Sequence, residues 1–134
     1  MIVAREEESR AHAATGAWGR VTLDQIVARN AGAHPDRLAV ADFADRAEWT
    51  GGPADGLTWR RLEARVEALA AFFAALGLLP DQVMVMQMPP TIDAVVAFLA
   101  ASRAGLIVAP LPLSAREAEA GDLCRRLSAR AVVT

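Results

Sequence analysis

The chain has 134 residues, a formal net charge of −2 and a composition that is 54% hydrophobic but only 5% aromatic. This length suits one domain or part of one. The nearly balanced charge does not indicate the strongly basic surface that is typical of nucleic-acid-binding proteins. All 14 basic residues are arginine, so these residues supply no lysine for phosphate contacts or Schiff-base chemistry.

Three features predict where the protein resides. The single cysteine, Cys124, rules out an internal disulfide and fits a reducing compartment. The longest apolar run, residues 69–79, is about half of the ~20 residues that a membrane-spanning helix needs. The acidic run Glu6–Glu8 stands where a secretory signal would be basic and then apolar. We therefore expect a cytoplasmic protein without a membrane span.

The beginning of the chain predicts a lead-in followed by one domain. Residues 1–20 are polar and alanine-rich with no sustained period, which indicates a flexible lead-in. Residues 21–134 are interpreted as the N-terminal α/β part of a larger domain. Its first helix begins at Thr22, where Gln25 lies at the spacing of a reciprocal capping box. The helix ends before Pro35, because a residue that precedes proline avoids the helical region.

The middle of the chain predicts a strand, a loop and a long helix. Residues 38–43 favour a short strand, and the Gly/Pro-rich residues 51–56 favour a loop. The helix begins near Thr58 and ends at Gly77, which suits a left-handed C-terminal cap. Apolar residues at steps of three and four predict its buried stripe: Leu62, Val66, Leu69, Phe73 and Leu76.

The following segments predict a buried strand–helix–strand unit. Residues 83–88 form a strand, and Thr91 is placed as the cap of the next helix. That helix, residues 92–103, is apolar on nearly every side and therefore needs cover on more than one face. Residues 106–109 form a continuous apolar strand, which is typical of a parallel sheet buried on both faces.

The C-terminal segment predicts one more helix and one more strand. Ser114 and Glu117 match a second capping box, which places a helix from there to about Ser128. Residues 131–133 predict the last strand. The order of elements indicates an α/β fold, a parallel sheet with flanking helices in β-α-β-α-β order.

A search for chemistry assigns no catalytic, cofactor-binding or metal-binding residue. His12 and His34 have no cysteine or paired carboxylate nearby, and Cys124 lies among leucines as a small core residue. The Gly51–Gly52 pair lacks the spacing and the lysine of a phosphate loop. Ser114 is interpreted as a cap because no base accompanies it. Two short basic pairs are interpreted as parts of solvent-exposed helix faces: Arg60–Arg61 and Arg125–Arg126.

Four segments, in order, resemble the N-terminal part of the adenylate-forming enzymes, which include acyl-CoA synthetases and aryl-acid AMP ligases. The resemblance covers roughly residues 17–134. Each motif alone is weak, and the order and spacing are the specific signal. The similar segments are His34-Pro-Asp-Arg37 before Leu38-Ala-Val40, Leu57-Thr-Trp59 before Glu63, Leu76-Gly77 through Val85, and Arg103-Ala-Gly105 through Leu111.

The resemblance implies a full-length ligase that forms an acyl-adenylate from a carboxylic acid and then an acyl thioester. ATP, Mg²⁺ and coenzyme A are implied for that enzyme, and none is assigned to these residues. The family's phosphate loop, its nucleotide motifs and its catalytic lysine have no counterpart here. Three positions depart from the family pattern: Arg61 replaces Glu, Pro80 replaces Gly and Pro90 replaces Asn.

Two other readings remain open. A stand-alone binding or assembly module could use the same scaffold, and a stop codon directly after Thr134 would favour it. A small flavodoxin-like nucleotide binder is a weaker alternative, since it would need a phosphate-cradling loop. If the chain is an N-terminal fragment, its partner is the remainder of the adenylation domain. Alone it is expected to be inactive and to self-associate through exposed apolar surface.

Overall fold

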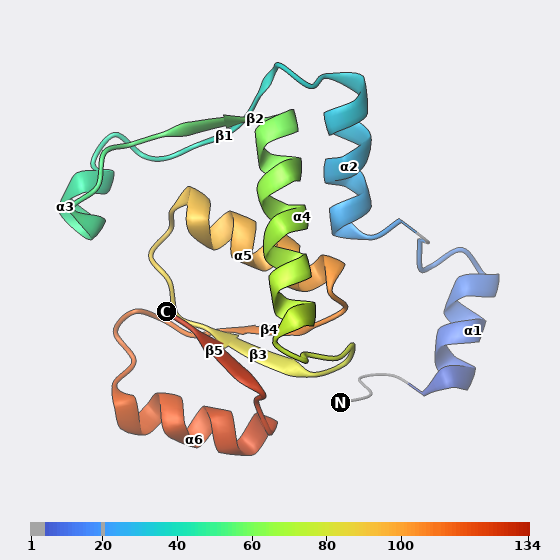
Figure 1. The fold of residues 1–134 in the computed structure, drawn as a ribbon. Helices are drawn as coiled ribbons and strands as arrows, with labels where there is room; N and C mark the ends of the chain where they lie inside the picture. Colours follow the sequence, from blue (N-terminus) through green and yellow to red (C-terminus); the bar gives the residue numbers. More distant parts are fainter. Residues whose placement is uncertain (1–4, 20) are drawn as a thin grey trace.

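The computed structural model of the protein describes residues 5–19 and 21–134 (Figure 1). Two parts of the predicted lead-in, residues 1–4 and residue 20, lie outside the described residues. The elements in chain order are α1 (Glu6–Ala14), α2 (Leu23–Ala33), β1 (Leu38–Ala41), α3 (Arg46–Thr50), β2 (Gly56–Thr58), α4 (Trp59–Ala75), β3 (Val83–Met86), α5 (Ile92–Arg103), β4 (Ile107–Pro110), α6 (Glu117–Leu127) and β5 (Ala131–Val133).

The predicted parallel sheet is confirmed. It has the strand order β4-β3-β5, with Val83 beside Ile107 and Val85 beside Val132. Helices α4 and α5 lie on one side of this sheet, and α6 lies on the other (Figure 1). Strand β3 is therefore paired on both edges and covered by helices, which explains why Val83, Met84 and Val85 are all buried.

The core lies where α4 packs against α5. Val66 of α4 and Ala100 of α5 are both fully buried, and the small alanines of α5 allow the two helices to approach closely. The predicted stripe on α4 is right for Leu62, Val66 and Phe73, but Ala70 continues it and Leu69 is only partly buried. Leu76 is 61% exposed, because it is the C-cap residue, where the chain leaves the helix.

A second, smaller sheet carries a projecting arm. The strand predicted at residues 38–43 is present as β1, but it pairs antiparallel with β2, which the sequence analysis missed. The connection between the two strands contains the short helix α3, which ends at Gly51 in the left-handed region (φ +71°). In Figure 1 this connection extends away from the α4–α5 core. We refer to residues 42–56 as the arm.

Residues 6–14 of the predicted lead-in form helix α1, which has no buried residue. Trp18 does not enter the core: it is 46% exposed, and its ring stacks on His12 with centroids 5.0 Å apart. Flexibility of the lead-in stays a prediction. Within the described residues, no helix combines the length and the apolar character needed to cross a membrane.

The predicted helix starts at Thr22 and Thr58 are confirmed, and the one at Ser114 is wrong. The backbone N–H of Thr22 donates to Gln25 Oε1 (3.2 Å), and Thr58 Oγ1 accepts from the N–H of Arg61 (3.4 Å). Ser114 does not cap α6. The N–H of Ala115 donates to the Pro112 carbonyl (3.0 Å), so Ser114 lies within a turn. Helix α6 begins at Glu117, with Arg116 as its N-cap.

The departure at Pro80 from the family pattern leaves the local turn intact. The N–H of Gln82 donates to the Leu79 carbonyl (3.2 Å), which closes a four-residue turn. Pro80 occupies its second position, where its fixed φ is favourable. Within this turn, Asp81 has the left-handed backbone (φ +64°). The turn packs against Gly105, whose carbonyl accepts from the N–H of Asp81 (2.9 Å).

Candidate functional site

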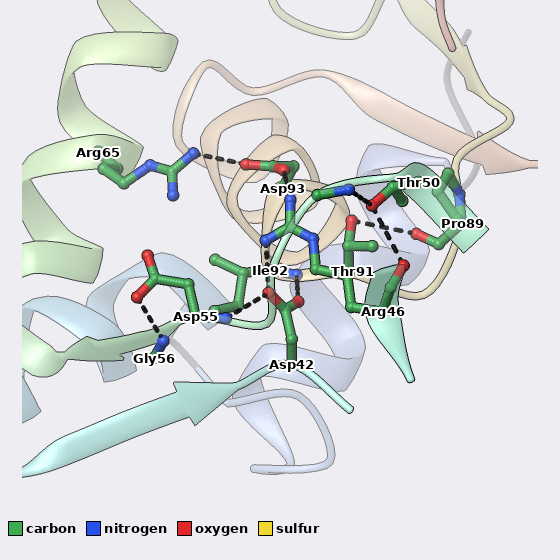
Figure 2. Close-up of polar contacts among 11 residues, drawn as sticks. Asp42, Arg46, Thr50, Asp55, Gly56, Arg65, Pro89, Thr91, Ile92 and Asp93 are labelled. Atoms are coloured by element: carbon green, nitrogen blue, oxygen red, sulfur yellow. Dashed lines mark hydrogen bonds and ion pairs between the residues drawn. The ribbon is translucent and has the colours of Figure 1, made fainter. Parts of the chain in front are cut away.

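A buried carboxylate from the arm caps helix α5. Asp42 Oδ1 accepts from the N–H of Ile92 (2.7 Å), and Oδ2 accepts from the N–H of Asp55 (3.2 Å) (Figure 2). The Asp42 side chain is only 1% exposed. Thr91 occupies the predicted N-cap position, but its side chain makes no capping hydrogen bond and donates instead to the Pro89 carbonyl (3.4 Å). The predicted cap is therefore right in position and wrong in chemistry.

Arg46 joins this cap to a chain of ion pairs. Its Nη1 contacts Asp42 Oδ2 (2.5 Å), and its Nη2 contacts Asp93 Oδ2 (2.8 Å). Arg65 of α4 contacts the other oxygen of Asp93 (2.5 Å). Three parts of the chain thus meet at the N-terminal end of α5: the arm, α5 itself and α4 (Figure 2). The buried Nε of Arg46 has no hydrogen-bond partner.

The contacts shift the pKa values of Asp42 and Arg46 in the directions that keep both groups charged. Burial alone would raise the pKa of Asp42, but hydrogen bonds from the backbone of Ile92 and Asp55 and from Arg46 together lower it below its usual value. The hydrogen bond to Asp42 raises the pKa of Arg46, and burial only partly opposes this. Asp42 and Arg46 therefore both stay ionised at neutral pH.

A pocket of about 260 Å³ lies beside this cluster, between the arm and the Pro90–Thr91 segment. The arm contributes Phe43, Asp45, Arg46 and Trp49, and the chain before α5 contributes Pro90 and Thr91. Two aromatic rings of the arm are strongly exposed, Phe43 at 69% and Trp49 at 62%. The indole Nε1 of Trp49 donates to Asp45 Oδ2 (3.4 Å).

The C-terminal edge of the parallel sheet is held together by Gln87. Its backbone N–H donates to Val133 O (2.8 Å), and its side-chain Nε2 donates to the carbonyls of Pro112 and Ala115, both at 2.9 Å. Ligands of open α/β sheets bind at this edge. Ser114 lines an open hollow there, beside Glu119. Gln87 fixes the loop after β4, and it supplies neither a nucleophile nor a base.

The structure does not gather the sequence candidates into a site. His12 on α1 and His34 at the end of α2 are both exposed, and Cys124 is a half-buried free thiol. Within the basic pairs, Arg60 is bound to Asp36 (3.1 Å) and Arg126 to Asp122 (2.7 Å).

The described residues do not fit the implied cofactors. Among residues 5–19 and 21–134, no group of three or more histidine, cysteine or acidic residues could hold a metal ion. The chain also has no lysine for the phosphates of ATP.

The comparisons with known proteins identify the family. The model of the AMP-binding enzyme family matches residues 27–134. The salicyl-AMP ligase / salicyl-S-ArCP synthetase of Mycobacterium tuberculosis is 32% identical over 127 residues, which cover 95% of this chain and 22% of that protein. Phosphinothricin tripeptide synthetase PhsC of Streptomyces viridochromogenes is 34% identical over 90 residues, 67% of this chain and 7% of that protein. The chain belongs to the AMP-binding enzyme family.

Solved structures confirm the fold. The N-terminal subdomain of Klebsiella oxytoca NpsA superposes with a TM-score of 0.69 at 19% identity, over 84% of this chain and 27% of that chain. IdnL1 gives a TM-score of 0.72 at 23% identity, over 85% of this chain and 22% of that chain. The chain thus spans 22–27% of these two solved chains, 22% of the salicyl-AMP ligase and 7% of PhsC. Its α/β architecture is that of the N-terminal part of an adenylation domain.

Proposed function

We propose that this chain is the N-terminal part of an ATP-dependent ligase that activates a carboxylic acid as its acyl-adenylate. The supporting observation is the family match over residues 27–134, joined to 32% identity with a relative named as a salicyl-AMP ligase. In the proposed reaction, a carboxylate oxygen bonds to the α-phosphorus of ATP and pyrophosphate leaves. A thiol then attacks the acyl carbon, and AMP leaves as the thioester forms.

The contribution of the described residues to this reaction is structural. Strand β3 and helix α5 form a buried layer, and Gln87 and Asp42 fix the chain where β3 and α5 meet their neighbours. We propose that the groups that bind ATP and Mg²⁺ belong to the remainder of the adenylation domain. A cytoplasmic location and a single unit over residues 21–134 are proposed with it.

The same relative supports a proposal for the substrate class. Its name specifies salicylate, an aromatic acid, and we propose an aromatic carboxylic acid here, with fatty acids as the alternative within the same family. Coenzyme A is the thiol that the family resemblance implies. A protein-bound thiol is the second candidate, because the relative's name also specifies a salicyl-S-ArCP product.

Exchange of pyrophosphate into ATP tests the proposal in a protein that begins with these residues. Salicylate, benzoate, a medium-chain fatty acid and a set of amino acids are supplied separately. We expect exchange with an aromatic acid, and mass spectrometry then shows whether coenzyme A or a carrier protein receives the acyl group. Absence of exchange with every acid would overturn adenylation as the function, and exchange only with amino acids or fatty acids would overturn the aromatic assignment.

A further inference from the structure

We propose that the pocket between the arm and the Pro90–Thr91 segment, which Asp45 borders, binds an arginine side chain presented by a basic segment of a partner protein. Three observations support this interaction: the size of the pocket, the aromatic rings beside it and the charge around it. The proposal does not depend on which acid the ligase activates.

The pocket is small, and large exposed aromatic side chains border it. Its volume of about 260 Å³ lies below the roughly 300–1,000 Å³ that is typical of sites for drug-sized ligands. It therefore suits one large side chain better than a whole small molecule. Phe43 and Trp49 are both more than half exposed, and buried aromatic and arginine contacts are the usual anchors of protein interfaces. An arm that displays two such rings is built for contact with another surface.

The charge around the pocket selects a cation. The arm carries four carboxylates (Asp42, Asp45, Glu48, Asp55) and one guanidinium (Arg46), a net charge of −3. The positive end of α5 does not attract an anion, because the Asp42 carboxylate already accepts from the N–H of Ile92 (2.7 Å). The guanidinium of Arg46 is likewise engaged by Asp42 and Asp93. The charged residues that line the pocket are Asp45 and Arg46, and Arg46 is paired with two carboxylates, so the acidic charge at the pocket is that of Asp45.

The geometry favours arginine over lysine. A planar guanidinium stacks on an indole face and presents paired N–H groups to a carboxylate, whereas an ammonium group offers a single strongly hydrated charge. Asp45 and Trp49 lie together, joined by the 3.4 Å hydrogen bond from Nε1 to Oδ2. One arginine could thus stack on Trp49 and donate to Asp45 at the same time, with Phe43 and Pro90 around its apolar stem.

The test is an NMR titration of the ¹⁵N-labelled chain with N-acetyl-L-arginine methylamide. The chain has three tryptophans, so the indole signals of Trp18 and Trp59 serve as internal controls for that of Trp49. We expect a saturable shift of the Trp49 indole and of amides in residues 43–49 and 90–91. The matched lysine derivative should shift them less, and the glutamate derivative should leave them unchanged. Equal shifts with the glutamate derivative, or shifts spread over the whole surface, would overturn the proposal.

Two variants and one control show whether the pocket itself is responsible. Asp45→Asn should weaken binding about threefold to fivefold, the loss expected for one partly exposed ion pair. Trp49→Ala should abolish saturation, and the exposed control Glu7→Gln on α1 should bind like the parent chain. Unchanged binding by Trp49→Ala would overturn the site.

Other occupants give distinct results. A Trp49 indole shift that grows with protein concentration without any probe would assign the pocket to a second copy of the chain. A Trp49 signal that the arginine probe shifts in residues 1–134 but not in a longer protein would assign it to that protein's own chain. Either result would overturn the assignment to a separate partner.

Discussion

Replacing Gly105 by alanine should destabilise the fold more than the same change at Gly77. Both glycines follow a helix and have left-handed backbones, with φ +73° at Gly105 and +78° at Gly77. A Cβ atom at Gly77 would meet no atom within 4 Å, whereas a Cβ at Gly105 would lie 3.1 Å from Pro80 Cβ. The free energy lost in Gly77→Ala therefore comes from the backbone conformation alone. In Gly105→Ala, a steric cost is added to it.

The magnitudes follow from these two terms. A left-handed alanine costs about 1–2 kcal/mol, and the reduced entropy of the unfolded chain returns about 0.4–1 kcal/mol, which leaves roughly 1 kcal/mol for Gly77→Ala. Contact with the rigid Pro80 ring is closer than the ~3.5–4.0 Å optimum between carbon atoms. Overpacking of this kind adds about 1–3 kcal/mol, so Gly105→Ala should cost roughly 2–4 kcal/mol.

Urea unfolding followed by circular dichroism measures both free energies, and Pro80→Gly completes a double-mutant cycle with Gly105→Ala. Because the double variant removes the clashing Pro80 ring, the two changes should couple favourably by about 1–3 kcal/mol. Equal costs at Gly77 and Gly105, or additive effects of Pro80→Gly and Gly105→Ala, would refute the steric explanation.

Three further predictions concern the core, the α5 cap and the exposed surface. Phe73→Ala should cost about 3–5 kcal/mol in urea unfolding because Phe73 is 4% exposed, whereas the same change at Phe72, 55% exposed, should cost far less. The lowered pKa of Asp42 means that its charge stabilises the fold above pH ~3.8 and that this contribution is lost as the pH falls through the folded pKa. Asp42→Asn should therefore weaken the acid dependence of the urea midpoint as the pH falls below ~3.8, and an unchanged profile would contradict the capping role. The isolated chain should sediment as concentration-dependent oligomers, and Phe98→Ser, on the apolar groove beside Val95, should reduce them; a monodisperse monomer at high concentration would contradict this prediction.

The sequence could predict those features whose cause lies within a few residues. The reciprocal pairing of Thr22 with Gln25 and the left-handed Gly77 depend on local spacing, and both are present. The bounds of α5 follow from a continuous apolar segment between a cap residue and a glycine. The incorrect assignment of Ser114 has a local explanation too, because the Pro112 turn competes with the helix start.

The site could not be predicted, because its contacts join distant segments. Asp42 caps a helix that begins 50 positions later, and Arg46 reaches Asp93 across 47 positions. No local spacing marks such pairs. The one available signal was an aspartate directly after a short apolar strand, which the sequence analysis included in the strand. Strand β2 could not be predicted for the same reason. Its three residues show no periodicity, and they are stabilised by pairing with β1.

The central claim is that these residues form the scaffold of an adenylate-forming ligase whose chemical groups belong to the rest of its domain. Pyrophosphate exchange into ATP tests it most directly when residues 1–134 are compared with a longer protein that begins with them, at equal concentration and with the same aromatic acid. The account predicts exchange by the longer protein and none above background by residues 1–134. Exchange by purified residues 1–134, abolished by unfolding them, would contradict it.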